Sequence, residues 1–215
     1  MSADPAALNV LHVVDSLERG GLERVVVDLA RAQQAAGGAP QVFCLYRTGG
    51  FAAELEQAGI PVLCGAKRDG LDLRTLWRLR CAVGRGCHIV HAHNLVPLYY
   101  AAAALRTRWH PPPLVDTCHD MGTRLADPRL RRLYLWAVPH ARRFAMVADA
   151  VHEVYVNGGL VPAARSTIIY NGIQTRRFAS GADRRAAGRL RLGVSADAPL
   201  IGAVGRLVPL KNHAS

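Results

Sequence analysis

Short apolar runs alternate with amphipathic stretches along most of the chain. Residues 9–14 (NVLHVV) form a continuous apolar run, as in a strand that is buried on both faces. Residues 22–35 instead repeat apolar side chains at helical spacing, which predicts a helix. The same patterns predict strands at residues 41–46, 61–64, 88–92, 114–118, 144–148 and 167–170, and helices at 51–58, 71–83, 96–105, 128–138 and 150–157. This alternation indicates an α/β fold over residues 8–175, with a doubly wound, Rossmann-like parallel sheet.

The composition changes after residue 175. Residues 176–198 are basic, rich in Ala and interrupted by Gly, which predicts a linker with a short helix at 184–192. Residues 199–204 (PLIGAV) then form a new apolar run that predicts a strand. This strand could be an extra edge of the first sheet. We instead expect residues 199–215 to be the truncated start of a second Rossmann-like domain, because one strand and a loop bury almost nothing alone.

Composition and charge narrow the choice of partners. Half of the residues are hydrophobic, and 27 Lys and Arg against 16 Asp and Glu give a formal charge of +11. The charge favours anionic partners, but no nucleic-acid-binding module is recognised, so we expect no nucleic acid. The five cysteines have no metal-ligand spacing and are expected to be reduced thiols. With no signal peptide or membrane span recognised, we expect a cytoplasmic protein.

A glycine pair lies in the loop between the first strand and the first helix. Gly20 and Gly21 would allow a ligand to approach the backbone, and the helix N-terminus attracts an anion. The loop is not GxGxxG, which argues against nicotinamide or flavin binding. A plain tight turn explains the pair equally well.

Polar residues follow two further strands. His91, His93 and Asn94 end one strand, and His119 and Asp120 follow the next. Because carboxyl ends of parallel strands share one edge of a sheet, these residues are candidates for one site. His91 and His93 face the same side, but no third metal ligand is evident, so we expect no metal site. Either histidine could simply bond a backbone carbonyl.

A basic pair comes near the end of the chain. Arg206 and Lys211 lie in a loop after the predicted strand at 199–204. A guanidinium fork and an ammonium could together neutralise a diphosphate. A solvated loop is the alternative interpretation.

Motifs in the same order resemble those of glycosyltransferase family 4, the retaining GT-B sugar transferases. VGRLVPLKNH (204–213) is similar to the family's GRL-x-x-x-K segment, the first loop to its GG-x-E loop, VHAHN (90–94) to its strand-end His motif, and TCHD (117–120) to its T-x-H segment. Residues 169–173 resemble its P-N-G-[IV]-D segment, although Tyr170 replaces Pro and Gln174 replaces Asp. The opening residues are similar to transferases of exopolysaccharide biosynthesis.

The resemblance implies a role for each candidate residue. Arg206 and Lys211, with Gly20 and Gly21, would contact the diphosphate of a nucleotide-sugar donor. His119 would lie near the transferred sugar, with the other strand-end residues on the acceptor side: His91, His93, Asn94 and Asp120. Transfer to a glycan or lipid-linked acceptor would proceed with retention and without a metal or other cofactor.

Two further interpretations remain open. The family's donor pocket and paired-glutamate motif lie in a second domain absent from these residues, so we expect a fragment that is inactive alone. A non-catalytic Rossmann-like binding or regulatory fragment is the main alternative. An oxidoreductase or epimerase is disfavoured because no Tyr-x-x-x-Lys dyad is present.

A basic and aromatic segment suggests a possible surface for anionic lipid. Arg124, Arg129, Arg131 and Arg132 lie near several Leu residues and Trp136. Such helices can bind the inner face of the plasma membrane peripherally. We favour the alternative, a solvated Arg face over a core-facing Leu/Trp stripe.

Overall fold

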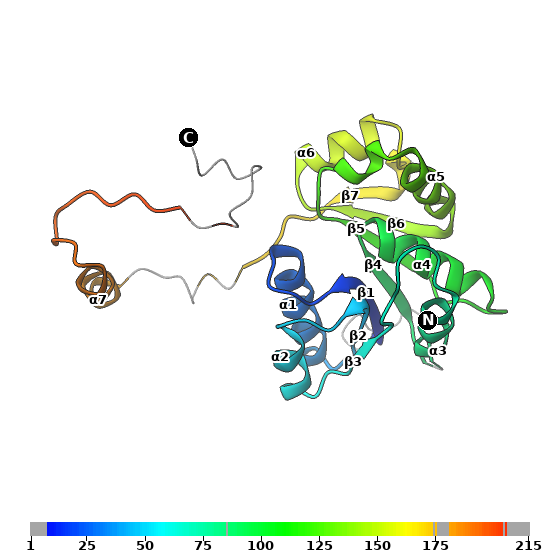
Figure 1. Ribbon diagram of the computed structural model, residues 1–215, viewed down its shortest axis with the longest axis horizontal. Helices are drawn as coiled ribbons and strands as arrows, with labels where there is room; N and C mark the ends of the chain where they lie inside the picture. Colours follow the sequence, from blue (N-terminus) through cyan, green and yellow to red (C-terminus); the bar gives the residue numbers. More distant parts are fainter. Residues whose placement is uncertain (1–7, 85, 174, 176–180, 204, 206–215) are drawn as a thin grey trace. The chain divides into compact units, whose positions relative to one another are not determined.

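The computed structural model describes residues 8–84, 86–173, 175, 181–203 and 205. The chain divides into two compact units, Met1–Gly172 and Ile173–Ser215. The first contains nearly all of the secondary structure (Figure 1).

A seven-stranded sheet forms the centre of the first unit. Its strands run β3-β2-β1-β4-β5-β6-β7 across the sheet, and every neighbouring pair is parallel. The predicted α/β, Rossmann-like fold is therefore confirmed. The strands are β1 (Val10–Ser16), β2 (Gln41–Arg47), β3 (Val62–Cys64), β4 (Ile89–His93), β5 (Leu114–Cys118), β6 (Ala141–Met146) and β7 (Ser166–Ile168).

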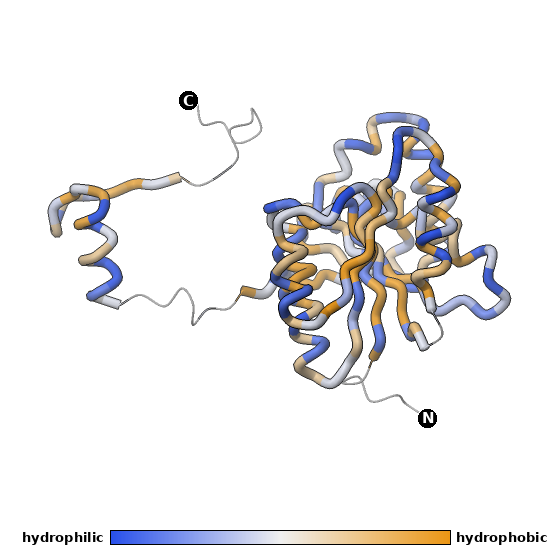
Figure 2. The backbone as a smooth tube through the Cα atoms, turned by 60° about the horizontal axis from the view of Figure 1, so that its bottom comes forward, coloured by the Kyte–Doolittle hydropathy of each residue, from blue (hydrophilic) through white to orange (hydrophobic). Residues whose placement is uncertain are grey.

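Helices cover both faces of this sheet, which explains why β1 has apolar side chains on both faces. Val14 packs in one core cluster with residues of α1 (Gly21–Ala35) and α2 (Ala52–Gln57). Val13, which points to the opposite face, belongs to a second cluster with residues of α3 (Leu73–Ala82), α4 (Leu95–Arg106) and α5 (Pro128–Ala137). In Figure 2 the hydrophobic strands lie between the helices of the two faces.

The strand order of the sheet changes direction between β1 and β4. From β1 it adds β2 and β3 on one side, then returns to place β4 on the other side of β1. In α/β sheets, ligands bind beyond the carboxyl ends of the strands at such a switch point. A ligand-binding site is therefore expected at the loops that follow β1 and β4.

Local sequence explains where two of the helices, α3 and α5, begin. Asp72 caps α3 by accepting hydrogen bonds from the backbone N–H groups of Arg74 and Thr75. Asp127 caps α5 in the same way, and Pro128 occupies the first turn. At α1 the N-cap residue is Gly20, which has no side chain to satisfy the free N–H groups. No N-cap side chain therefore occupies this helix start, and the carboxylate of Glu23 in the first turn lies beside Gly20.

Several boundaries differ from the predicted ones. β6 begins at Ala141, earlier than expected, because Arg142 and Arg143 extend the strand with exposed side chains. The predicted helix at 150–157 is α6 (Asp149–His152) followed by a π-helical turn, Glu153–Asn157. β7 ends at Ile168, two residues before the predicted end.

The second unit contains one described helix, α7 (Ala182–Leu192), which ends at Gly193 in the left-handed conformation. Arg189 donates hydrogen bonds to the carbonyls of Ser195 and Ala198 after the helix. The predicted strand at 199–204 is wrong for its described part, since residues 199–203 form no strand and Ile201 is 97% exposed. A strand needs a hydrogen-bonded neighbour, and the described residues of this unit offer none.

Candidate functional site

The loop between β1 and α1 is held in place by the loop after β2. The Leu17 N–H donates to the carbonyl of Thr48, and the Phe51 N–H donates to the carbonyl of Leu17, both at 2.9 Å. Gly49 has a φ of 78°, and a Cβ there would collide with the backbone of Leu17. These contacts fix the position at which α1 begins.

The two glycines at the start of α1 differ in the space around them. A Cβ at Gly21 would meet no atom within 4 Å, so packing does not require glycine there. A Cβ at Gly20 would collide with the Glu23 carboxylate, which lies directly beside this residue. The open side at Gly21 therefore leaves room for a ligand near the N-terminus of α1, which attracts negative charge.

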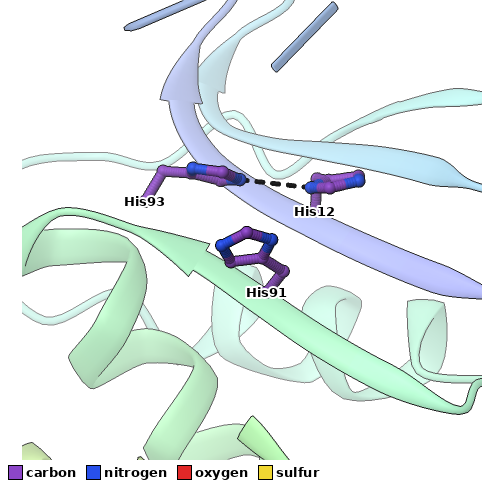
Figure 3. A group of neighbouring side chains, drawn as sticks. All are labelled: His12, His91 and His93. Atoms are coloured by element: carbon purple, nitrogen blue, oxygen red, sulfur yellow. Dashed lines mark hydrogen bonds between the residues drawn. The ribbon is translucent and has the colours of Figure 1, made fainter. Parts of the chain in front are cut away.

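Three histidines meet on the α1 side of β1 and β4 (Figure 3). His12 lies opposite His91 in the parallel pairing of the two strands, and His93 is two residues further along β4. Each of the three residues offers one ring nitrogen, and these three nitrogens lie within 4.8 Å of one another. His12 and His93 are buried, whereas His91 is half-buried.

A chain of hydrogen bonds leads from α1 through these histidines to His119. Gln33 Oε1 lies 2.8 Å from His12 Nε2, His12 Nδ1 lies 3.1 Å from His93 Nε2, and His93 Nδ1 lies 3.0 Å from His119 Nε2. Because Gln33 Oε1 only accepts, His12 carries its proton on Nε2. His93 and His119 must then also donate from Nε2 when all three rings are neutral.

The last nitrogen of this chain is His119 Nδ1, which is buried and has no hydrogen-bond partner in the described part of the protein. With the proton on Nε2, this atom is an acceptor. A buried polar atom without a partner is costly, and a bound group that completes the hydrogen bond removes that cost. His119 is therefore the strongest single candidate for contact with a bound molecule.

Burial keeps the four imidazoles neutral. Desolvation lowers the pKa of His12 and His119 to about 4, with Gln33 and Asp120 respectively opposing the shift. Desolvation also lowers the pKa of His91 and His93 well below the ordinary value, and the neighbouring histidines lower it further. At neutral pH the histidines can exchange hydrogen bonds and bind metals, but they are not positive charges.

Asn94 connects the two strand ends. Its φ of 71° is unusual for a residue other than glycine, and the strained corner places its side chain against the next loop. There Asn94 Oδ1 accepts the backbone N–H of His119 at 2.7 Å, and the Asn94 N–H donates to the carbonyl of Thr117. Asn94 thus positions the backbone of His119.

Charged groups surround the same edge. Asp15, near the end of β1, lies 3.7 Å from Arg124, and burial raises the pKa of its carboxyl to about 6. Asp120 accepts hydrogen bonds from the Gly122 N–H and the Tyr155 hydroxyl, so it shapes its own loop. These contacts give Asp120 a structural task at the place where the sequence suggested a ligand contact.

The structure brings together the predicted residues of β4 and the β5 loop: His91, His93, Asn94, His119 and Asp120. His91 and His93 do not hydrogen-bond to backbone carbonyls of the described residues. His91 bonds Thr117 Oγ1, and His93 bonds two other histidines. Gly20 and Gly21 lie at the start of α1, while Arg206 and Lys211 lie outside the described residues.

Sequence reasoning missed His12 and Gln33. His12 was concealed inside an apolar strand, and its pairing with His91 depends on a register that the chain does not reveal locally. Gln33 faces His12 from the last turn of α1. Consequently the third imidazole, whose absence had argued against a metal site, is present.

Comparison with known proteins identifies the family of this chain. The sequence model of Glycosyltransferase Family 4 matches residues 19–177. The chain is 28% identical over 220 residues to a D-inositol 3-phosphate glycosyltransferase of Kribbella flavida, covering 90% of this chain and 51% of that protein.

Solved structures share the fold. HepE of Anabaena in complex with UDP-glucose superposes with a TM-score of 0.71 at 20% identity, over 86% of this chain and 50% of HepE. A glycosyltransferase of Rickettsia africae gives a TM-score of 0.69 at 15% identity, over 90% of this chain and 51% of its own. The chain thus spans about half the length of the relatives it matches. Because the family model matches most of the sequence, the chain belongs to glycosyltransferase family 4.

Proposed function

We propose that this chain is the acceptor-side half of an enzyme that transfers a sugar, with retention, from a nucleoside-diphosphate donor to a glycan or lipid-linked acceptor. One observation carries the proposal: among the described residues, His119 Nδ1 is buried and has no hydrogen-bond partner, and it lies at the edge where α1 also begins. The names of the relatives fit this proposal, since one acts on D-inositol 3-phosphate and another binds UDP-glucose.

The start of α1 suits the leaving diphosphate. Its free N–H groups carry partial positive charge, and the open space at Gly21 lets phosphate oxygens reach them. As the bond between sugar and diphosphate breaks, negative charge grows on the leaving oxygens. Fixed N–H groups aimed at that charge stabilise the transition state more than the ground state. Arg206 and Lys211 would add two full positive charges.

His119 suits a sugar hydroxyl. With its pKa lowered to about 4 by burial, the ring is neutral, and its Nδ1 can accept a hydroxyl proton in a hydrogen bond. Asn94 holds the backbone of His119, and His93 holds its Nε2, so the free nitrogen has a fixed direction. In this proposal His119 orients the sugar, no side chain acts as a strong base, and no metal ion takes part at the diphosphate.

A version of the protein that continues beyond Ser215 through a second domain tests the diphosphate contacts. Replacing Arg206 or Lys211 by Ala should raise the donor KM or lower kcat by about 10- to 100-fold in total, because one hydrogen bond to a charged group is lost. Arg191→Ala, on the exposed end of α7, is the matched control. Equal rates for all variants would refute the assignment, and a product of inverted anomeric configuration by NMR would refute retention.

Helix α5 presents an exposed surface that supports the proposed binding to anionic membranes. On α5, Leu133, Leu135 and Trp136 are 41%, 36% and 39% exposed, beside the exposed Arg129 and Arg132. The core-facing stripe that we favoured from sequence is therefore wrong for these three residues; Tyr134 and Ala137 are the buried ones. An exposed apolar and basic face is typical of peripheral binding to anionic lipid.

Vesicle co-sedimentation checks this surface. We expect the chain to pellet with vesicles containing phosphatidylglycerol and to remain in solution with pure phosphatidylcholine. The double variant Arg129→Glu and Arg132→Glu should lose binding while it keeps its thermal stability, since both side chains are exposed. Binding that is indifferent to lipid charge would refute the electrostatic attachment. No described helix is long and apolar enough to cross a bilayer.

A further inference from the structure

The cluster of His12, His91 and His93 has the donor set of a transition-metal site. All three offer neutral imidazole nitrogens, and no carboxylate lies among them. Imidazole suits zinc, copper, iron and nickel, whereas magnesium and calcium prefer oxygen. Zinc–nitrogen bonds of about 2.0–2.1 Å place tetrahedral ligand atoms about 3.4 Å apart. The nitrogens here lie 3.1 Å apart for one pair and within 4.8 Å for all, so small side-chain shifts suffice.

Each imidazole also has an outer partner. His12 Nε2 bonds Gln33 Oε1, His91 Nε2 bonds Thr117 Oγ1, and His93 Nδ1 bonds His119 Nε2. Metal-binding histidines are normally held in this way, with one nitrogen on the metal and the other hydrogen-bonded to a second residue. Of the remaining nitrogens, His12 Nδ1 and His93 Nε2 face each other within the cluster.

An ion could reach the cluster from the surface. A cavity of about 330 Å³ opens beside α1 and is lined by Gln33, Ile89, His91 and Val115, among others. His91 is the half-buried member of the cluster, so it connects the cavity with the two buried histidines. A ligand-binding path of this kind is what a buried site needs.

We propose that His12, His91 and His93 bind one divalent transition-metal ion, with Zn²⁺ as the reference ion. The site lies on the α1 side of β1 and β4, and its member His93 bonds His119 directly. Its ligands are different residues from those proposed to contact the diphosphate. The ion would tie β1 to β4 at the switch point of the sheet.

Binding has a chemical consequence for His119. Without metal, His93 Nε2 carries a proton and His119 Nδ1 is an acceptor. When Nε2 of His93 binds the ion, the proton of that ring moves to Nδ1, which then donates to His119 Nε2. His119 in turn carries its proton on Nδ1, so both rings stay neutral and the number of protons is unchanged. Metal occupancy thus converts the free nitrogen of His119 from acceptor to donor; that this nitrogen meets a sugar rests on the proposed function.

Metal titration of the tag-free, EDTA-treated chain tests the site. Co²⁺ should give saturable visible absorption bands with one ion per chain, and Zn²⁺ should displace it. His91→Gln should weaken Zn²⁺ binding at least tenfold by calorimetry, with His110→Gln, an exposed histidine outside the cluster, as the matched control. His91 is chosen because it is less buried than its partners, and circular dichroism checks that the variant folds.

Absent or non-stoichiometric binding by the folded chain would overturn the proposal, as would equal affinity of the two variants. ¹⁵N NMR then tests the consequence at His119. Zn²⁺ should move the protonated nitrogen of this ring from Nε2 to Nδ1, and an unchanged tautomer would refute the switch. Neither readout involves sugar transfer, so the metal site can fail while the proposed function stands, and the reverse.

Discussion

Gln33 anchors the buried histidine chain, and its removal should cost measurable stability. In Gln33→Leu the Nε2–H of His12, which is buried, loses its 2.8 Å acceptor. A buried donor left unsatisfied costs about 1–3 kcal/mol. With a urea m-value of about 2 kcal/mol/M for a domain of this size, the unfolding midpoint should fall by about 0.5–1.5 M. Urea denaturation followed by circular dichroism measures this shift.

The neighbouring residue provides the matched control. Gln34 donates from its side chain to the carbonyl of Ala58, and both residues are half-buried, so water can replace the lost bond. Gln34→Leu makes the same change on the same helix and should cost about 0.5 kcal/mol or less. If the two variants unfold at the same urea concentration, the bond between Gln33 and His12 contributes no special stability and the reasoning fails.

Two further predictions concern Gly49 and Asp15, which lie next to the loop between β1 and α1. Gly49→Ala should destabilise the chain in urea by at least about 1 kcal/mol more than Gly59→Ala, because both have positive φ but only a Cβ at Gly49 collides with the backbone of Leu17; equal losses would contradict this. Asp15→Asn should raise the Tm at pH 7 and not at pH 4. In the folded protein the pKa of Asp15 is raised to about 6, so ionisation of its carboxyl lowers the free energy of unfolding as the pH rises from about 4 through 6. Asn cannot ionise and avoids this loss. An increase in Tm of equal size at pH 4 and pH 7 would refute the prediction.

Most of the sheet could be predicted because the apolar residues of a buried strand are visible in its own sequence. The run at β1 is apolar on both faces, and helices cover both. β6 was harder, since Arg142 and Arg143 are exposed in the strand and concealed its first residues. The run at 199–203 is apolar but forms no strand, because apolar character alone does not supply a pairing partner.

The residues of the site that follow from the order of strands along the chain were predicted. Those that depend on the register between two strands were missed. Parallel strands place His93 and His119 at one edge, which the sequence shows directly. The contact of His12 with His93 depends instead on how β1 aligns with β4, and no local pattern reveals that alignment. Similarly, the positive φ of Asn94 follows from its task of holding the next loop.

The central claim is that the edge holding His119 is the site of sugar transfer. The most direct measurement is the rate of sugar transfer by a version of the protein that includes a second domain, using a panel of nucleotide sugars and acceptors. His119→Ala should lose about 10- to 100-fold in kcat/KM, the cost of one unmade buried hydrogen bond, while His110→Ala, an exposed histidine outside the cluster, should match the unmodified protein. Equal kcat/KM for both variants would contradict the account.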